Sequence, residues 1–250
     1  MTITLYDIPS SAPGGTWSPH VWKVLQVLNY KCVSYKTEWI EMCDIELHCQ
    51  SLGIEPTIKR ADGSVIYTLP AIYDNVTGVY VADSLPIAEY LETRYPTPSI
   101  FPGGTKGLQF AFEEALLKHT ASVWQFVIGV AIDILPEPRT KEFYRRTREK
   151  SWGKHLEAMA PPKVSEEREK EWGKAREAWS KVAKWYGQEQ GGPFMLGETV
   201  SWTDFVVSGH LFWYRAVWGE ESAEWQDVMT WDDGHWKTFC DAMKPHSETR

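Results

Sequence analysis

The first 95 residues alternate between two patterns of apolar positions. Apolar and polar residues take turns over 2–8, which is the period of a strand with one buried face. Over 18–30 the apolar residues instead recur every three or four positions, which predicts a helix. The same criteria predict strands at 32–39, 67–74 and 78–83, a short irregular helix at 41–53, and a helix from Ser84 that stops before Pro96. The resulting order, βαβαββα, indicates an α/β domain.

A segment rich in proline and glycine separates this half from the rest. Residues 96–105 contain three prolines and two glycines and predict a linker. Beyond it the strand patterns vanish, so we expect an α/β domain at 1–95 followed by an all-helical domain at 106–250. The predicted helices of the second half cover about 106–133, 139–158, 164–189, 202–217 and 233–243.

The overall composition is that of a globular protein, with 43% hydrophobic and 24% charged residues. The formal net charge of −8 repels phosphate backbones, which disfavours nucleic acid as a partner. No apolar run approaches the roughly 20 residues of a membrane span, and the N-terminus lacks a cationic segment followed by an apolar one. We therefore expect a cytoplasmic protein with no membrane partner.

The cysteines and histidines give no support to a metal site. Cys32, Cys43, Cys49 and Cys240 form no C-x-x-C pair, and no histidine lies at zinc-finger spacing from them. We expect these four cysteines to be reduced thiols. The region 139–184 spaces opposite charges three or four residues apart, which predicts solvated helices rather than a binding surface.

Tryptophan is unusually frequent: the chain has 14, and 11 of them fall between Trp124 and Trp236. Most are expected to form a large aromatic core. The alternative is that some line a pocket for flat, apolar ligands, because aromatic ring faces offer contact area at a low entropic cost.

Three short stretches of the first half carry candidate chemistry. In the first, Pro70 interrupts a run of strand residues, which places the Leu69–Pro70 pair at an edge or bend of the sheet. A cis peptide there would turn the Leu69 N–H and C=O outward, ready to pair with an extended peptide. The simpler interpretation is an edge-strand proline.

In the second stretch, the Asp83–Ser84 pair closes a strand and opens a helix. The Ser84 hydroxyl and the free N–H groups at the helix start form an anion site suited to a carboxylate. Asp83 beside it suits an ammonium group. A carboxylate and an ammonium on one carbon describe the end of an α-amino acid, whereas the alternative is that Ser84 is only a helix cap.

The third stretch, WSPHV at 17–21, completes a pattern that resembles the glutathione transferase family over nearly all 250 residues. The proline before a strand, the acidic-Ser pair and the Y-P end of the following helix occur in the family's order. In the second half, GETVSWTDFVVSG at 197–209 resembles the family's capping box, so Ser201 and Asp204 are assigned to folding. The stretches TITLYDI, SPHVWKVLQVLNYK, YKTEWIEMCDIE and YTLPAIYD are similar to the fungal-specific FuA class, itself similar to bacterial glutathione-dependent lignin β-aryl etherases.

The resemblance implies a thioredoxin-like first domain that binds glutathione, an apolar acceptor site facing the helical domain, and a homodimer. Ser18 takes the position where family members place the Ser or Cys that contacts the glutathione sulfur, so it is the candidate catalytic residue. The expected glutathione-binding residues are Leu69, Pro70, Asp83, Ser84 and Trp39. The expected acceptor-site residues are His20, Phe110, Trp124 and Trp213. No metal is implied.

Two interpretations of Ser18 stay open, since Ser-Pro is also an ordinary helix start. Either its hydroxyl stabilises the glutathione thiolate, or it only caps the helix and Thr16 or a backbone N–H holds the sulfur. A serine cannot form a mixed disulfide with glutathione, which disfavours a glutaredoxin-like thiol transferase and favours conjugation or substitution. His20 either donates a proton at the site or is a solvent-facing or structural residue.

The leading functional hypothesis is therefore a serine-type glutathione transferase that attacks aromatic electrophiles, including the cleavage of β-aryl ethers. The alternative is a non-catalytic ligandin that binds aromatic metabolites. A third hypothesis, a regulatory or scaffolding member without the chemistry, is disfavoured because the three stretches of the glutathione site are all intact.

Overall fold

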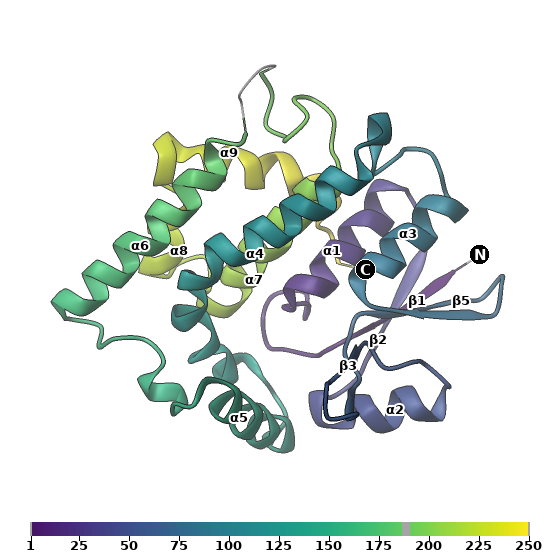
Figure 1. Ribbon diagram of the computed structural model, residues 1–250, viewed down its shortest axis with the longest axis horizontal. Helices are drawn as coiled ribbons and strands as arrows, with labels where there is room; N and C mark the ends of the chain where they lie inside the picture. The colour runs from purple at the N-terminus through teal and green to yellow at the C-terminus, as the bar shows by residue number, and fades with distance from the viewer. Residues whose placement is uncertain (1, 187–190, 250) are drawn as a thin grey trace.

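The computed structural model describes residues 2–186 and 191–249, and Figure 1 shows an α/β part beside an all-helical part. The α/β part is built on a four-stranded sheet with the strand order β2-β1-β5-β6. β1 is parallel to β2 and antiparallel to β5, which is in turn antiparallel to β6. The strands are β1 (Ile3–Asp7), β2 (Tyr35–Trp39), β5 (Ala71–Asp74) and β6 (Val79–Ala82). This mixed sheet followed by helices is the architecture that the sequence predicts.

Helices cover both faces of this sheet. α1 (Pro19–Tyr30) and α3 (Ser84–Arg94) lie together on one face, and α2 (Ile45–Ser51) lies on the other (Figure 1). α1 is buried continuously from Val21 to Asn29 because it is enclosed between the sheet and α7 (Trp202–Trp218) of the helical part. The first helix is thus part of the core of both halves.

Three details of the α/β part differ from the expected elements. The strand expected at 67–74 begins only at Ala71, after the cis Leu69–Pro70 peptide. The strand predicted at 32–39 begins only at Tyr35, because Cys32 adopts a left-handed conformation (φ 53°) that turns the chain after α1. A small hairpin of β3 (Ile58–Lys59) and β4 (Val65–Ile66) is also present. Its strands of two residues are too short to show a period of two in the sequence.

The second half is helical, with α4, α6, α7 and α9 packed on one another. The helix expected at 106–133 stops at Ile128, and a 3₁₀ turn, η3, follows. The helix expected at 139–158 breaks at Gly153, which is left-handed (φ 65°). Residues 187–189 of the helix expected at 164–189 lie outside the described residues. The elements are α4 (Lys106–Ile128), η3 (Ala131–Ile134), α5 (Pro138–Trp152), η4 (Leu156–Ala158), α6 (Glu166–Ala183), α7, the unexpected α8 (Ala223–Val228), and α9 (Trp231–Met243).

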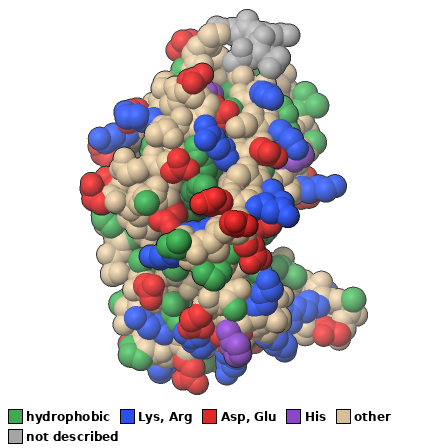
Figure 2. All heavy atoms as spheres, turned by 90° about the vertical axis from the view of Figure 1, so that its left-hand side faces the viewer, with side chains coloured by type: hydrophobic (Ala, Val, Ile, Leu, Met, Phe, Trp, Pro, Cys, Tyr) green, Lys and Arg blue, Asp and Glu red, His purple; other side chains and the backbone are tan. Residues whose placement is uncertain are grey.

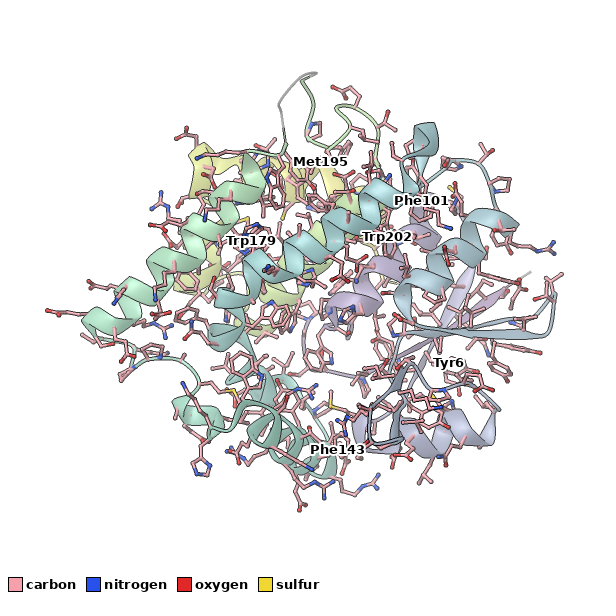
Figure 3. All side chains as sticks on the ribbon, in the orientation of Figure 1. Tyr6, Phe101, Phe143, Trp179, Met195 and Trp202 are labelled. Atoms are coloured by element: carbon pink, nitrogen blue, oxygen red, sulfur yellow. The ribbon has the colours of Figure 1, made fainter. Side chains whose placement is uncertain are left out.

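The segment between the two halves is anchored on α7. Phe101 and the first residue of α7, Trp202, lie close together, with ring centroids 6.3 Å apart (Figure 3). The Trp202 N–H donates to the carbonyl of Ile100 at 2.8 Å. The capping box expected at the start of α7 is present: the Ser201 N–H donates to the Asp204 carboxylate at 2.9 Å.

Most tryptophans belong to the aromatic core, as expected. In the helical part Trp179 packs edge-on against Trp236 at 4.8 Å, and Trp172 contacts Trp231 at 5.4 Å. The tryptophan content therefore has a structural explanation for most of its members. The buried tryptophans are Trp17, Trp22, Trp179, Trp202, Trp213, Trp225, Trp231 and Trp236.

The charged region at 139–184 has outer faces on which side chains of both signs are interspersed (Figure 2). Its first helix, α5, nevertheless reaches the α/β part. Arg139 pairs with Asp44 at 3.1 Å, and the Thr140 hydroxyl donates to Glu41. The segment these residues meet is the turn η1 (Met42–Asp44) before α2. α5 is thus a second connection between the halves and not only a solvated helix.

The structure also bears on the expectations about membranes and cysteines. Within residues 2–186 and 191–249 no helix has the length and apolar character needed to cross a membrane. All four cysteines are free thiols.

Gly209 on α7 allows the close approach of α7 to α1. A Cβ at this position would lie 2.6 Å from the Pro19 carbonyl oxygen. We therefore predict that Gly209→Ala lowers the free energy of unfolding by on the order of 1–3 kcal/mol through overpacking. The matched control is Gly173→Ala on α6, where a Cβ meets no atom within 4 Å. It should raise stability by about 0.5–1 kcal/mol because alanine loses less backbone entropy. Urea denaturation measures both, and a Gly209→Ala variant as stable as the wild type would contradict this packing.

Candidate active site

Strand register brings the candidate residues to one edge of the sheet. Asp7 at the end of β1 is paired with Trp39 at the end of β2. On its other side, the antiparallel register of β5 against β1 places Pro70 next in line opposite Asp7. The Asp83 N–H, just after β6, donates to the Pro70 carbonyl at 3.1 Å. Trp39, Asp7, Pro70 and Asp83 therefore form a row across the sheet, and the chain that leaves β1 from this row leads to Ser18.

Ser18 takes the backbone position of a helix cap without using its side chain as one. It precedes Pro19, the first residue of α1, in an extended conformation, and its carbonyl accepts the Trp22 N–H at 3.0 Å. The residue is 7% exposed. Across the part of the chain that the structure describes, its hydroxyl has no hydrogen-bond partner. The hydroxyl is therefore available to a ligand at the sheet edge.

Thr16, the other hydroxyl near this helix start, is already engaged. It is buried, and its Oγ1 donates to Asp7 Oδ2 at 2.7 Å. The Ile8 N–H donates to Asp7 Oδ1 at 2.6 Å. Burial raises the pKa of Asp7 to about 7, although both hydrogen bonds act in the opposite direction. While Asp7 is ionised, the Thr16 proton is committed to it and cannot be donated to a sulfur.

The other two stretches lie side by side, as the sequence predicts. The Leu69–Pro70 peptide is cis, and the Leu69 N–H and C=O have no backbone partner among the described residues. Asp83 is exposed and left-handed (φ 74°) at the N-cap of α3, and Ser84 is the buried first residue of that helix. The free N–H groups of a helix of eleven residues thus lie beside an exposed carboxylate.

Trp39 lies against the loop that leads to Ser18. Its side chain is 42% exposed. A Cβ on Gly15 would lie 2.7 Å from Trp39 Cη2, so the indole covers the Gly15 backbone. Glycine is required here both by this contact and by its φ of 78°. Trp39 therefore presents an open ring face at the end of the row farthest from Asp83.

On the helical side, His210, Trp213 and Trp124 are neighbours, and His20 lies on the first turn of α1. His20 is exposed on the first turn of α1, and the nearby Lys23 ammonium holds its pKa well below the usual range. It is therefore a neutral imidazole near pH 7 rather than a cationic proton donor. The ring of buried His210 lies 6.4 Å from that of Trp213. The Trp213 ring lies 6.4 Å from that of Trp124.

Phe110 is not brought together with this group. It packs edge-on against Phe101 of the linker at 5.7 Å, and the Lys106 ammonium lies 5.6 Å from its ring. Fourteen positions separate it from Trp124 on α4, which is about 21 Å along the helix axis. The two residues cannot border the same small ligand, and the packing on the linker accounts for Phe110.

Sequence reasoning missed the buried polar groups around α1. Lys23 is fully buried and pairs with Glu113 of α4 at 2.6 Å, and the Trp202 indole N–H donates to the same carboxylate at 2.9 Å. The signal was present in the sequence, because Lys23 falls among the apolar positions of the helix. Asp7 was missed because an acid at the end of a strand is more often solvated. Its partner Thr16 is nine residues away across a loop.

The loop before Ser18 also contacts the helical part. The Ser11 N–H donates to the Ile134 carbonyl of η3 at 2.8 Å, and the Trp17 ring packs edge-on against Tyr144 of α5 at 6.3 Å. Both halves of the molecule therefore hold the segment that carries Ser18. Among the residues described, no group of three His, Cys, Asp or Glu side chains is placed to hold a metal ion.

Two family models match the chain. The model described as "Glutathione S-transferase, N-terminal domain" matches residues 17–94, and "Glutathione S-transferase, C-terminal domain" matches residues 107–246. Among curated proteins, the chain is 29% identical over 251 residues to the glutathione S-transferase-like protein ustS of Aspergillus flavus. This match covers 95% of the chain and 88% of the relative.

Solved structures of fungal glutathione transferases are similar over the full length. A glutathione S-transferase of Ceriporiopsis subvermispora, in complex with glutathione, is 39% identical with a TM-score of 0.93, covering 99% of this chain and 98% of that one. Glutathione transferase GSTFuA3 of Phanerochaete chrysosporium is 32% identical with a TM-score of 0.90, covering 100% and 99%. β-Etherase LigF from Sphingobium sp. strain SYK-6 is 16% identical with a TM-score of 0.56, covering 99% and 89%, a likeness of fold alone. The resemblance drawn from the sequence motifs is confirmed.

The raised pKa of Asp7 predicts a pH-dependent stability. A carboxyl that binds its proton more tightly in the folded state stabilises the fold most below its unfolded pKa of 3.8. That contribution is lost as the pH rises to about 7. Relative to Asp7→Asn, the wild type should therefore lose on the order of 4 kcal/mol of unfolding free energy between about pH 4 and pH 8. Urea denaturation of both proteins across this range measures the difference.

The control for this measurement is Asp74→Asn. Asp74 is buried too, but hydrogen bonds from Tyr90 and from the amides of Val76 and Thr77 outweigh the effect of burial and lower its pKa. The contribution of Asp74 to the stability of the fold is lost only as the pH falls through its lowered pKa. The difference in unfolding free energy between wild type and Asp74→Asn should show no decline between about pH 4 and pH 8. A difference between wild type and Asp7→Asn that stays constant over this range would show that Asp7 is ionised at no cost.

Proposed function

The chain belongs to the glutathione S-transferase family, and from this premise we propose that it activates glutathione as a thiolate at Ser18 and transfers it to aromatic electrophiles. The observation that carries the proposal is the buried Ser18 hydroxyl, without a partner among the described residues, at the start of α1. It stands where the row of Trp39, Asp7, Pro70 and Asp83 meets the helical part.

The row is long enough to hold an extended tripeptide and suits its chemistry. Four neighbouring strands span about 14 Å, and an extended tripeptide reaches about 10 Å. At one end, Asp83 suits the α-ammonium of the γ-glutamyl group, and the start of α3 at Ser84 suits its carboxylate. The Leu69 backbone would pair with the middle of the peptide, and Trp39 would cover its glycine end. The middle residue, cysteine, then falls beside the chain segment that carries Ser18.

The available interactions suffice to activate the thiol. A cysteine thiol titrates near pH 8.5, so lowering its pKa by about two units needs about 2.7 kcal/mol of selective thiolate stabilisation. A hydroxyl that hydrogen-bonds an anion contributes about 1.5–3 kcal/mol, and a helix N-terminus about 0.3–1 kcal/mol. Ser18 at the start of α1 combines both. With the Thr16 proton engaged by Asp7, the support for Thr16 as the alternative donor is weakened.

For the second substrate we propose an aromatic electrophile held on the side of His20, Trp213 and Trp124. Within that class, displacement of a phenolate from a β-aryl ether is the specific reaction that the sequence motifs favour. Phenolate is a tolerable leaving group because phenols of this kind titrate near pH 10. To His20, whose pKa the nearby Lys23 ammonium lowers, we assign hydrogen bonding to the substrate rather than the role of a cationic acid.

The structure weakens one argument for the alternative, a non-catalytic ligandin. The excess of tryptophan suggested a ligand pocket, but most of these side chains pack on one another in the core. A homodimer and a cytoplasmic location remain part of the proposal, and light scattering of the purified protein tests the first.

Replacing Ser18 with alanine should raise the pKa of enzyme-bound glutathione. We expect a bound-thiol pKa near 6–7 in the wild type and a rise of about one to two units in Ser18→Ala, because the hydroxyl hydrogen bond is lost. Ultraviolet absorbance of the thiolate near 240 nm measures it. The matched control, Ser84→Ala, should weaken glutathione binding without moving the bound-thiol pKa. A thiol pKa near 9 in both wild type and Ser18→Ala would reduce Ser18 to a helix cap and favour the carrier.

A fluorescent β-aryl ether tests the specific reaction. We expect release of the phenol only when glutathione is present, at a rate that Ser18→Ala lowers at least about tenfold, as a loss of 1.4 kcal/mol of transition-state stabilisation implies. An aromatic halide offered to the same preparations is the control. Turnover of the halide without release of the phenol would exclude ether cleavage while leaving the transferase intact.

A further inference from the structure

Asp7 is a buried carboxylate without a cationic partner. It has no solvent-exposed surface, and none of the ion pairs found among residues 2–186 and 191–249 includes it. Burying an unpaired carboxylate costs free energy. Lys23 and Lys31 differ from Asp7, because each is buried but pairs with the carboxylate of a partly exposed glutamate. The hydrogen bonds of Asp7 therefore indicate which part of the structure requires a carboxylate at this position.

Those contacts fix the chain on either side of the loop that leads to Ser18. The Thr16 hydroxyl and the Ile8 N–H both donate to the carboxylate, at 2.7 and 2.6 Å. The Asp7 carbonyl accepts the Ile40 N–H of the neighbouring chain segment at 2.8 Å. Thr16 is buried and lies two residues before Ser18. The chain just before α1 is thus attached to the last residue of β1 by the hydrogen bond from the Thr16 hydroxyl to the Asp7 carboxylate.

We propose that Asp7 is a positioning residue for glutathione activation, which acts through the Thr16 hydroxyl to fix the 16–18 turn and leave Ser18 as the hydroxyl that donates to the thiolate. The inference rests on the proposed function. It assigns two residues outside the motifs of the glutathione site to the reaction. It also gives a reason for the hydrogen bond of the Thr16 hydroxyl, which donates to Asp7.

The sheet contains an internal control for this arrangement. Asp74, at the end of β5, accepts the Tyr90 hydroxyl at 2.7 Å and the Val76 N–H at 2.8 Å. It is as buried as Asp7, but it pairs with Ile3 and so lies at the opposite end of the sheet. The two acids make the same kinds of contact, and only one of them is at the proposed site.

The experiment is the pH titration of the thiolate of bound glutathione in matched variants of the full chain. We expect Thr16→Val to raise the bound-thiol pKa by about one unit, which is a tenfold fall in the thiolate-to-thiol ratio at a given pH. Thr16→Ser should restore the pKa to within about 0.3 unit. Tyr90→Phe, which removes the corresponding hydroxyl at Asp74, should leave it unchanged. If both substitutions only destabilised the fold, Thr16→Val and Tyr90→Phe would both lower the melting temperature. The bound-thiol pKa would then not differ between the two variants.

The bound-thiol pKa of Asp7→Ala is a second, independent test of this role. Removing a nearby negative charge alone would lower the thiol pKa, because an anion disfavours another anion. A higher bound-thiol pKa in Asp7→Ala would therefore show that positioning has been lost. In the double variant Asp7→Ala/Thr16→Val, the pKa should rise no further than in the single variant with the larger effect. Asp74→Ala is its control and should leave the bound-thiol pKa unchanged.

The outcomes separate this inference from the function on which it rests. If Ser18→Ala raises the bound-thiol pKa while Thr16→Val moves it by less than about 0.3 unit, the role of Asp7 is refuted and the transferase proposal stands. A fall in Asp7→Ala also refutes it, since the carboxylate would then act by charge alone. If Ser18→Ala leaves the pKa unchanged, both proposals fail.

Discussion

The register of the inner strand β1 is the constraint on which the site depends. Because β1 pairs with β2 on one side and with β5 on the other, its last residue, Asp7, comes between Trp39 and Pro70. A shift of one residue would turn the side chains of β1 to the opposite face and separate the row. The pairing of β5 with β6 brings Leu69–Pro70 next to Asp83–Ser84. The register of β1, together with the Thr16–Asp7 hydrogen bond, brings the stretch that carries Ser18 to the same edge of the sheet.

The second constraint is the position of α1 between the two halves. The buried Lys23–Glu113 pair and the Trp202 indole join it to α4 and α7, and Gly209 lets α7 approach its first turn. A hydroxyl at the start of such a helix has little freedom to move, which lowers the entropic cost of aligning it with a thiolate. Contacts from η3 and α5 to the preceding loop add to this rigidity. The helical part thus helps to hold the start of α1, where we propose that glutathione is activated.

The sequence was sufficient for the fold and for placing the short motifs at the boundaries between elements. Ser18, Leu69–Pro70 and Asp83–Ser84 each lie at a boundary between elements, where proline and capping residues mark the position of the backbone. The contact of Asp7 with Thr16 and the docking of α5 on η1 depend instead on how loops and helices fold back, for which one sequence shows no period. Phe110 was grouped with Trp124 because both are aromatic residues of one helix, although the length of that helix keeps them apart.

The most direct test of the account is the structure of this chain with glutathione bound. The account predicts that the sulfur lies within hydrogen-bonding distance of the Ser18 hydroxyl, with Thr16 still donating to Asp7 and the γ-glutamyl group between Asp83 and the start of α3. A sulfur held by Thr16 or by a backbone N–H, with the Ser18 hydroxyl turned away, would contradict it.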